Sequence, residues 1–568
     1  MDTDRAAPKP GPAELRTRTS VIGRWHRTAV LLVVCVVGGG VLAACSSSSS
    51  SSPTNADSGA VLLVGTFQGH AGKYKTIQSA VNAAKSGDWI LIAPGDYHET
   101  ADESGAWTDP SDGDTGGVMI TTSGIHLRGM NRSTVIVDGT KAGSPACSSD
   151  PSAQNYGAPG SGGQAVGRNG ILIWKANNVS VDNMTICNFL GGTGNAGNEI
   201  WWNGGDNSGT IGIKGYEGSY LTATSTFFSA QGTAAQQEAT AAEYGIFSSN
   251  SAGPAAWNQI YASNFNDSGS YVGACHQVCD VTINHAWMEY NALGYSGTNS
   301  GGAIVIENSQ FDNNQDGLDT NTQIDGDPPA PQNGECPDNG TSPITHTHSC
   351  WVFIHNNSHN NNNPNVPEAG EVAAGPIGTG MTLSGGRNDT VMDNSFYDNG
   401  AWGFLLVPYP DSGTPSLNQK CSEVGGVEEA GLGCVFDPEG DNLTDNHFSH
   451  NGYFGNPSNS DYGQIVFNAG QPQNCFSGNT APNGSAPANL EQIQPTCRKI
   501  TTEANTGGPL LDQVLCDSQI IASACPAGSN YPRHTGVVMH PLPSGLPTMS
   551  NPCQGVPTNA WCVGGKPV

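Results

Sequence analysis

The sequence is poor in charged residues, which make up 12% of its 568 positions. Basic residues are especially scarce, with 21 Lys and Arg against 49 Asp and Glu. The first 44 residues hold six basic and three acidic side chains, so the remainder has 15 basic and 46 acidic ones, a net charge of −31. Such a surface repels nucleic acid and anionic lipid, and we expect no nucleic-acid partner. Solvation is our main interpretation of this charge, with binding of divalent cations as the alternative.

Several catalytic and metal-binding motifs are absent as well. No CxxC pair repeats, so we do not expect cysteine-bound metal. We find no Rossmann, P-loop or nucleophile-elbow motif, and no Ser/His/Asp pattern that indicates a nucleophilic hydrolase. The composition also lacks the excess of Leu, Ala, Glu and Lys that a helical bundle would need.

Glycine and asparagine are abundant instead, with 76 glycines and asparagine runs such as residues 360–363. Gly, Asn and Asp supply the positive-φ positions and tight turns that join short strands. With 36% hydrophobic residues in regular spacing, the chain has enough apolar side chains to bury a core. We therefore predict a fold rich in strands and turns.

The N-terminus indicates export. Four arginines between residues 16 and 27 precede an apolar run over residues 29–44, which is too short and too glycine-interrupted to be a good membrane span. The run ends in Leu42-Ala43-Ala44-Cys45, which resembles the lipobox of bacterial lipoproteins. The resemblance implies cleavage before Cys45, a lipid on its thiol, and a place on the extracellular face of the cell membrane. We predict a signal peptide over 1–45 and a flexible serine-rich linker over 46–59. The alternative is an ordinary secretory peptide, which does not explain the seven serines.

Fourteen cysteines remain after Cys35 of the apolar run and Cys45 are set aside. An even number in an oxidising compartment predicts up to seven disulfides. The sequence does not determine their connectivity. Proximity along the chain suggests the pairs Cys275–Cys279, Cys336–Cys350, Cys421–Cys434, Cys475–Cys497, Cys516–Cys525 and Cys553–Cys562, which leaves Cys147 and Cys187 to pair.

A short amphipathic helix is predicted directly after the linker. Ile77, Ala80, Val81 and Ala84 share one helical face, Thr76 can serve as N-cap, and Ser86-Gly87 ends the helix. Residues 89–93 follow as a buried strand, and Pro94-Gly95-Asp96-Tyr97 as a turn.

This segment resembles the N-terminal segment of the pectate-lyase-like superfamily of right-handed parallel β-helices, where a short helix caps the open end of the coil. A cap is needed because the first coil would otherwise expose unpaired backbone groups. The resemblance implies an all-β solenoid, which we place over residues 60–497, and a protein that acts on or binds polysaccharide.

The rest of the body repeats an apolar strand followed by an Asn-containing turn, as at residues 170–173, 179–186, 281–287, 303–311, 351–357, 390–396 and 442–448. About one coil per twenty-odd residues fits a solenoid, with strands ~4.8 Å apart. We expect the turn asparagines to form a structural ladder. Inserts are expected at 141–168, 231–242 and 320–349. The Cys- and Pro-rich tail, residues 498–568, is expected to cover the C-terminal end of the coil.

Asp316 is the first candidate catalytic residue. Residues 313–321 resemble the N-T-D-G-I-D element of polygalacturonase-type glycoside hydrolases, with Asn314 and Asp316 matching and Gln315 in place of Thr. The family's D-D, G-H-G and R-I-K elements are absent. A glycosidase needs two carboxyls, and Asp319 is the second candidate. Strand alternation would place the two on opposite faces unless the chain turns at Gly317. The alternative is one more Asn/Asp turn.

His355 and Arg387 are candidate partners of these carboxylates, because residues on consecutive rungs of a parallel coil stack into one strip. A lyase that acts on sugar acids needs a cation or Ca²⁺ to neutralise the carboxylate and a base to remove a proton. Arg387 would supply the cation. Its alternative role is a surface ion pair with Asp389 or with an acid of the 320–349 insert.

Asp325 and Asp327, with Glu335 and Asp338 nearby, are speculative Ca²⁺ ligands because clustered carboxylate oxygens suit that ion. A second acidic group lies between residues 437 and 445, and solvated loop acids are the alternative for both. A set of aromatic residues is expected on loops, where the rings would stack on sugars or pack the loops: Trp201, Trp202, Tyr216, Tyr220, Trp257, Tyr271 and Trp402.

The sequence thus supports two hypotheses about function. In the first, a monomeric, lipid-anchored β-helix binds polysaccharide and cleaves it as a lyase or glycoside hydrolase. In the second, the same protein is a non-catalytic surface or carbohydrate-binding β-helix.

Overall fold

The computed structural model describes residues 59–101, 115–159, 163–192, 196–205, 209–233, 236–237, 240–298, 300–321, 351–367, 375–411, 426–429, 433–467, 474–496, 509–518 and 525–568. The predicted signal peptide, Cys45, the serine linker, Asp325 and Asp327 lie outside these residues. In the described part of the chain, no helix combines the length and hydropathy that a bilayer span requires.

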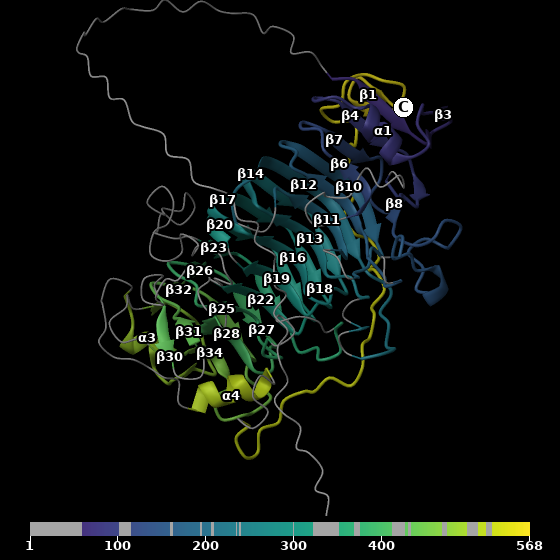
Figure 1. Ribbon diagram of the computed structural model, residues 1–568. Coiled ribbons are helices and arrows are strands. Elements are labelled where there is room, and N and C mark those ends of the chain that lie inside the picture. The colour runs from purple at the N-terminus through teal and green to yellow at the C-terminus, as the bar shows by residue number, and fades with distance from the viewer. Residues whose placement is uncertain are drawn as a thin grey trace, which may run out of the picture. The chain divides into compact units, whose positions relative to one another are not determined.

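The described chain winds as a right-handed parallel β-helix, as predicted (Figure 1). Each complete coil passes through three parallel rows of strands. The first and second rows form one 20-stranded sheet, and the third row forms an 11-stranded sheet. Strands β10 (Val179–Cys187) and β12 (Ile213–Thr224) each run through both the first and the second row.

The first row also contains β1 (Val61–Val64), β4 (Trp89–Ile92), β7 (His126–Gly129), β14 (Ser251–Asn258), β17 (Cys275–Asn284), β20 (Ser300–Glu307), β23 (Trp351–Ile354), β26 (Thr390–Met392), β32 (Asn442–Thr444) and β35 (Cys475–Ser477). The second row contains β5 (Gly95–Tyr97), β8 (Val135–Asp138), β15 (Tyr261–Ser263), β18 (Trp287–Glu289), β21 (Gln310–Asp312), β24 (Asn357–His359), β27 (Ser395–Tyr397) and β33 (His447–Ser449).

The third row contains β6 (Gly116–Ile120), β9 (Asn169–Trp174), β11 (Asn198–Asn203), β13 (Tyr244–Ser249), β16 (Ser268–Gly273), β19 (Leu293–Thr298), β22 (Asp316–Asn321), β25 (Thr382–Ser384), β28 (Trp402–Val407), β34 (Ser460–Gln464) and β36 (Ser485–Ala486). Smaller sheets are formed by β2 (Thr66–Phe67) with β3 (His70–Ala71), by β29 (Tyr409–Asp411), β30 (Val427–Glu429) and β31 (Gly433–Phe436), and by β37 (Cys562–Val563) with β38 (Lys566–Pro567).

Helices occur at the ends of the coil and in the tail. Helix α1 (Ile77–Ala83) places Ile77, Ala80 and Val81 on the core, and Thr76 caps it by accepting the Ser79 N–H at 3.2 Å, as predicted. Helix α3 (Leu490–Ile493) inserts Leu490 into the core at the C-terminal end. Helix α4 (Pro509–Asp517) packs through Leu510 and Cys516 against outward residues of β28.

The corners of the coil are made by single residues with positive φ. Tyr290, Asn313, Asn360, Asp398 and His450 follow the second-row strands and have φ between 53° and 61°. The next residue in each case is a buried asparagine. Its side-chain oxygen accepts the backbone N–H of the equivalent asparagine on the preceding rung, in the order Asn291, Asn314, Asn361, Asn399, Asn451, at 2.9–3.2 Å. A second ladder joins Asn356, Asn394, Asn446 and Asn479, so the predicted asparagine ladder is confirmed.

Replacing a ladder residue should destabilise the fold strongly. Asn399 accepts from the Asn361 N–H at 3.1 Å and donates to the Ser358 carbonyl at 3.1 Å. Asn399→Ala leaves both buried groups without these partners, and each such loss costs about 1–3 kcal/mol. We expect the free energy of unfolding in urea to fall by about 3 kcal/mol. Gln492→Ala, at an exposed position of α3, is the control and should change little. If the free energy of unfolding of Asn399→Ala equals that of the unmodified protein, water must replace the hydrogen bonds that the asparagine made.

Four predicted disulfides are present: Cys147–Cys187, Cys275–Cys279, Cys516–Cys525 and Cys553–Cys562. Cys434 and Cys475 are also disulfide-bonded. Their predicted partners, Cys421 and Cys497, lie outside the described residues, as do Cys336 and Cys350.

The C-terminal tail was expected to cover the end of the coil. Helix α4 packs near Ala486 of the last third-row strand, but the later residues of the tail lie elsewhere. After α4 the tail runs back along the coil and ends beside β1 and β4 (Figure 1). There Cys553, Val556 and Trp561 pack on Leu91 and Ala93, on the outer side of the first row. Helix α3 closes the C-terminal end of the core instead. The later part of the tail packs on the side of the coil.

The tryptophans predicted on loops lie in strands instead. Trp202 and Trp257 are fully buried in the core, while Trp201 and Trp402 pack under smaller outer clusters. These wide coils need large side chains to fill them, so the rings are not available to sugars.

Candidate functional site

Asp316 and Asp319 lie in β22 of the third row. Thr382 and Ser384 of β25 donate to them at 2.5 and 2.8 Å, so both carboxyls lie on one side of the sheet. Gly317 is inside the strand and not at a turn. A Cβ there would lie 2.1 Å from the Gly380 carbonyl oxygen.

Asp316 is enclosed. It is 2% exposed, and burial, followed by the charge of Asp319, raises its pKa well above the ordinary value. Burial also raises the pKa of Asp517 at the end of α4; Arg533 opposes this shift and the charge of Asp316 adds to it. Helix α4 therefore lies over this part of the third row.

The other two predicted residues lie elsewhere on the coil. His355 forms the exposed corner between the first and second rows, with its Nε2 4.0 Å from Asp393 Oδ2. Arg387 is 2% exposed, and its Nε lies 3.2 Å from Glu439 Oε1. The expected surface pair with Asp389 is thus replaced by a buried pair with Glu439. Because these residues occupy different positions within their coils, they do not form the single strip that we predicted.

The outer side of the second row carries a different set of polar residues. In each second-row strand from β15 to β27, the middle residue is buried. Four of these residues, Ala262, Met288, Phe311 and Phe396, belong to the core. The flanking residues therefore face outward and align in two columns. We call Tyr261, Trp287, Gln310 and Asn357 the first column, and Ser263, Glu289, Asp312, His359 and Tyr397 the second column.

Two carboxyl groups lie next to each other in the second column, Glu289 with 5% and Asp312 with 4% of its surface exposed. Glu289 and Asp312 are register partners on adjacent strands, which places them about one strand spacing, ~4.8 Å, apart. Tyr261 donates its hydroxyl to Glu289 at 2.7 Å. Asp312 accepts from Trp287 Nε1 at 2.7 Å, Gln310 Nε2 at 2.9 Å and Asn313 Nδ2 at 2.7 Å. Each carboxyl is thus held by side chains of the first column or of the corner.

The environment separates the acidities of these two groups. Burial is the main cause that raises the pKa of Glu289 to about 7, and the charge of Asp312 adds to it. Burial also raises the pKa of Asp312, but the N–H donors around it and the neighbouring His359 oppose that shift. Near neutral pH, Glu289 can therefore hold a proton, while the N–H donors at Asp312 favour the ionised form of that carboxyl.

His359 and Tyr397 continue the second column. Their rings stack with centroids 4.4 Å apart. Burial lowers the pKa of His359, and Asp312 and Asp398 act in the opposite direction. Burial, and then the charges of Asp312 and Asp398, raise the pKa of Tyr397. The second column therefore offers a proton donor, a carboxylate, an imidazole and a phenol along one face, a set suited to acid–base chemistry.

A cavity of about 240 Å³ lies over the first column. Leu546 and Pro547 of the tail form part of its wall. Its lining residues are Arg132, Gln259, Ile260, Tyr261, His285, Ala286, Trp287, Asn308, Ser309, Gln310, Asn357, Leu546 and Pro547. The guanidinium of Arg132 donates to Thr222 Oγ1, the Leu221 carbonyl and the Pro547 carbonyl. Its charge is therefore engaged by protein oxygens at the edge of the cavity.

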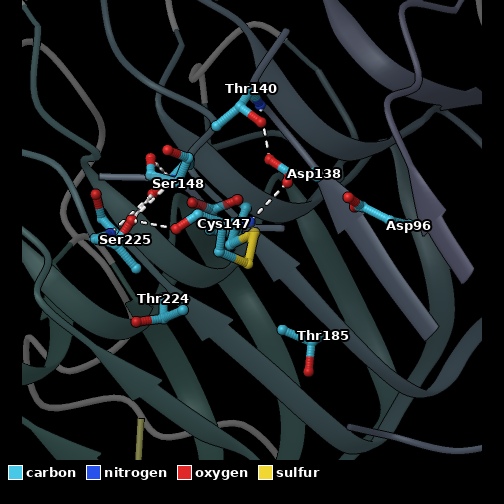
Figure 2. The surroundings of a disulfide bond; sticks show 12 residues. Asp96, Asp138, Thr140, Cys147, Ser148, Thr185, Thr224 and Ser225 are labelled. Atoms are coloured by element: carbon cyan, nitrogen blue, oxygen red, sulfur yellow. Dashed lines mark hydrogen bonds between the residues drawn. A yellow bond between two sulfur atoms is a disulfide. The ribbon is translucent and has the colours of Figure 1, made fainter. Parts of the chain in front are cut away.

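Two groups of side chains among the described residues have the spacing of metal ligands. In the first, Asp138 lies beside Cys147 and Cys187, but these sulfurs are joined in a disulfide (Figure 2). Asp138 instead accepts the backbone N–H groups of Thr140 and Cys147. In the second, Asp96, His98 and Asp138 come together, with His98 Nε2 3.3 Å from Asp96 Oδ2. His98 Nδ1 also lies 2.9 Å from the Thr140 carbonyl oxygen, so both ring nitrogens have protein partners.

The buried carboxyls should make the protein more stable in acid. A carboxyl whose pKa is raised by folding contributes stability that is complete below its unfolded pKa and is lost as the pH rises through its folded pKa. For Glu289 that window runs from its ordinary value of 4.5 to about 7. Asp316, Asp389 and Asp441 shift in the same direction. We expect the free energy of unfolding to be larger at pH 5 than at pH 8, with a smaller difference in Glu289→Gln. Stability that increases from pH 5 to pH 8 would contradict this account.

Sequence reasoning missed the second column because no known motif marks it. A usable signal does exist. The triplets at 287–289, 310–312, 357–359 and 395–397 each have a polar or aromatic residue on both sides of a core residue, and each is followed by a corner residue and an asparagine. Alignment of these repeats would have placed Glu289, Asp312, His359 and Tyr397 in one column.

No protein-family model matches this chain, and no curated protein matches its sequence. Two solved protein structures from Azotobacter vinelandii and one from Paenibacillus are similar to this chain. The A-module of mannuronan C-5 epimerase AlgE6 is 12% identical with a TM-score of 0.43, over 72% of this chain and 94% of that chain. The A-module of AlgE4 is 12% identical with a TM-score of 0.39, over 71% and 89%. An alginate lyase from Paenibacillus is 12% identical with a TM-score of 0.29, over 72% and 93%. Because these values are low, the parallel β-helix assignment rests on the strand pairing of the chain itself.

Proposed function

We propose that the protein binds a polysaccharide along the outer side of the second row and cleaves it by acid–base chemistry. The observation that carries the proposal is the pair Glu289 and Asp312, two carboxyls on adjacent rungs, of which Glu289 has its pKa raised to about 7 and Asp312 accepts three N–H donors. Glycoside hydrolysis requires two such groups, one that gives a proton and one that is ionised.

In this proposal Glu289 protonates the oxygen of the leaving sugar. Asp312 acts as the nucleophile on the anomeric carbon, with its carboxylate oriented by three N–H donors. Water, deprotonated by Glu289, then releases the sugar from Asp312. If the two carboxyls are about as far apart as their strands, ~4.8 Å, this separation is closer to the value in retaining glycosidases, about 5–5.5 Å, than to about 6.5–9.5 Å in inverting ones. We therefore expect the product to keep the configuration of its anomeric carbon.

A neutral polysaccharide fits the charges better than an acidic one. The sequence after residue 44 has a net charge of −31, and Arg132, the Arg of the cavity wall, is engaged by protein oxygens. The partly exposed rings of Trp287 and Tyr397 give flat surfaces on which sugar rings can stack.

The lipid anchor remains part of the proposal. The four described disulfides fit an oxidising compartment, which agrees with export. If Cys45 carries the anchor, Cys45→Ser should release an otherwise folded protein from the membrane fraction into the medium. Retention of that variant in the membrane would show that another segment anchors the chain.

A polysaccharide screen tests the function. The purified protein is incubated with neutral glucans, xylans and mannans and with uronate polymers, and reducing ends and unsaturated uronates are both measured. We expect reducing ends from a neutral polymer, and their loss in Asp312→Asn. Unsaturated uronates among the products would show that the protein cleaves by elimination and not by hydrolysis. Binding without any product, unchanged in Asp312→Asn, would favour the non-catalytic hypothesis.

A further inference from the structure

Three side chains near the N-terminal end of the coil present metal-binding atoms to one another. Asp96 in β5 and His98 just after it are two positions apart, so both leave the same side of the chain. Tyr97 between them packs toward the core, which places that side outward. The pairing of Tyr97 with Val137 continues to His98 and Asp138, one rung further. The carboxyl of Asp96 faces that of Asp138 (Figure 2), and the ligand atoms of all three side chains lie within 4.8 Å of one another.

The hydrogen bonding of His98 leaves a nitrogen lone pair for a cation. Its Nδ1 lies 2.9 Å from the Thr140 carbonyl oxygen. A carbonyl oxygen can only accept, so Nδ1 carries the proton. In the neutral ring, Nε2 then presents its lone pair to Asp96 Oδ2 at 3.3 Å, and two acceptors face each other. A metal ion between them would bond to both, and a histidine that binds metal commonly donates its other N–H to a backbone carbonyl in this way.

The separation of these two atoms favours a metal ion over a proton. A charge-assisted N–H···O bond is normally about 2.7–2.9 Å long. At 3.3 Å, the contact between His98 Nε2 and Asp96 Oδ2 is long for such a bond. Zinc binds imidazole nitrogen and carboxylate oxygen at about 2.0–2.2 Å, so two ligands of a tetrahedral zinc ion are about 3.3–3.5 Å apart. The observed separation lies in that range.

Asp138 is held in place as the third ligand. It is fully buried, and its two oxygens accept the backbone N–H groups of Thr140 at 2.8 Å and Cys147 at 2.7 Å. The Cys147–Cys187 disulfide fixes the loop that supplies the second donor. Each carboxylate oxygen keeps a further lone pair. The Asp96 side chain is 31% exposed, so an ion can reach the site from solvent and this carboxyl can turn to complete it.

We propose that Asp96, His98 and Asp138 bind one Zn²⁺ ion, with water at the fourth position. One imidazole and two carboxylates suit a first-row divalent ion, whereas Ca²⁺ takes about six to eight oxygen ligands. The tetrahedral separation selects Zn²⁺ among the first-row ions. The two carboxylates balance the charge of the ion. The site joins β5 to β8, on other strands than Glu289 and Asp312, so the inference is independent of the proposed function.

Calorimetric titration with Zn²⁺ tests the inference on the full chain, purified without a histidine tag and stripped of metal by a chelator. We expect one tight site per chain, and an affinity reduced by more than about 10-fold in Asp96→Asn. Asp398→Asn is the matched control and should keep the affinity of the unmodified protein. Asp398 also pairs with a histidine, His450 at 2.6 Å, but belongs to no three-ligand group among the described residues. A missing tight site, or equal affinity in Asp96→Asn, would overturn the inference.

X-ray absorption at the zinc edge gives a second measurement that needs no variant. If circular dichroism shows that Asp96→Asn does not fold, the zinc-loaded unmodified protein decides. One imidazole among four nitrogen and oxygen neighbours at about 2.0–2.2 Å supports the site. Any other shell, such as oxygen alone, two imidazoles or sulfur, overturns it. Failure here leaves the polysaccharide screen unaffected, because the zinc site takes no part in the proposed cleavage.

Discussion

Glu289→Gln is expected to lower kcat by about 10²–10⁴-fold, the usual contribution of a general acid. Glutamine keeps the shape of the side chain and can still accept the Tyr261 hydroxyl, but it has no proton of suitable acidity to give to the leaving oxygen. KM should change far less, because the stacking surfaces and the cavity wall remain. Steady-state kinetics on the polymer identified in the screen provide the measurement.

The pH profile makes this prediction specific to Glu289. A general acid works only while protonated, so the activity of the unmodified protein should fall as the pH rises through about 7, the value to which burial raises the pKa of Glu289. The residual activity of Glu289→Gln should lack that decline. Glu217→Gln, at an exposed position of β12, is the control and should keep both rate and profile. A Glu289→Gln variant with full activity would remove this residue from the mechanism and direct attention to His359 and Tyr397.

Arg387→Met is expected to reduce the free energy of unfolding by about 3–5 kcal/mol, the usual cost of removing one partner of a buried ion pair. Arg387 is 2% exposed and lies against Glu439, while Asp437 and Asp441 also contribute negative charge at this guanidinium. Without the arginine, these acids would be left buried with less compensating charge. Chemical denaturation followed by circular dichroism measures the loss.

The double variant Arg387→Met with Glu439→Gln separates the charge from the packing. Because it removes one buried charge of each sign, it should recover part of the stability lost in Arg387→Met. At temperatures where Arg387→Met is still folded, its kcat should equal that of the unmodified protein. A selective loss of kcat in a fully stable Arg387→Met would restore the catalytic role that the sequence suggested for this residue.

The capping helix illustrates what local sequence is able to determine. The spacing of Ile77, Ala80 and Val81, the Thr76 cap and the strand from Trp89 are all within one short segment, and the structure confirms each. The same holds for the asparagines that follow each corner. An asparagine that recurs at the same place in every coil stacks on its equivalents and can form a hydrogen-bonded ladder with them. Four disulfides also follow from neighbouring cysteines or, for Cys147–Cys187, from the pair that remained.

The candidate site shows where this reasoning stops. Asp316 was singled out by a short motif, but the motif does not reveal that α4, some 190 residues later, lies over that part of the third row. Arg387 was interpreted as a surface cation because its partner Glu439 belongs to the following coil, whose register depends on the loops between them. Insert length decides which residues of consecutive rungs align, and inserts carry little pattern.

The sequence by itself determined the solenoid, its N-terminal cap and its asparagine ladder, because these depend on periodicity and on contacts between neighbouring repeats. Tertiary structure alone decided that Glu289, Asp312, His359 and Tyr397 share one column, and that the tail returns to the N-terminal coils. Both depend on strand register and on contacts between residues hundreds of positions apart, such as Arg132 with Pro547. Local propensity does not encode such contacts, because the free energy of docking is gained only after the coil has formed.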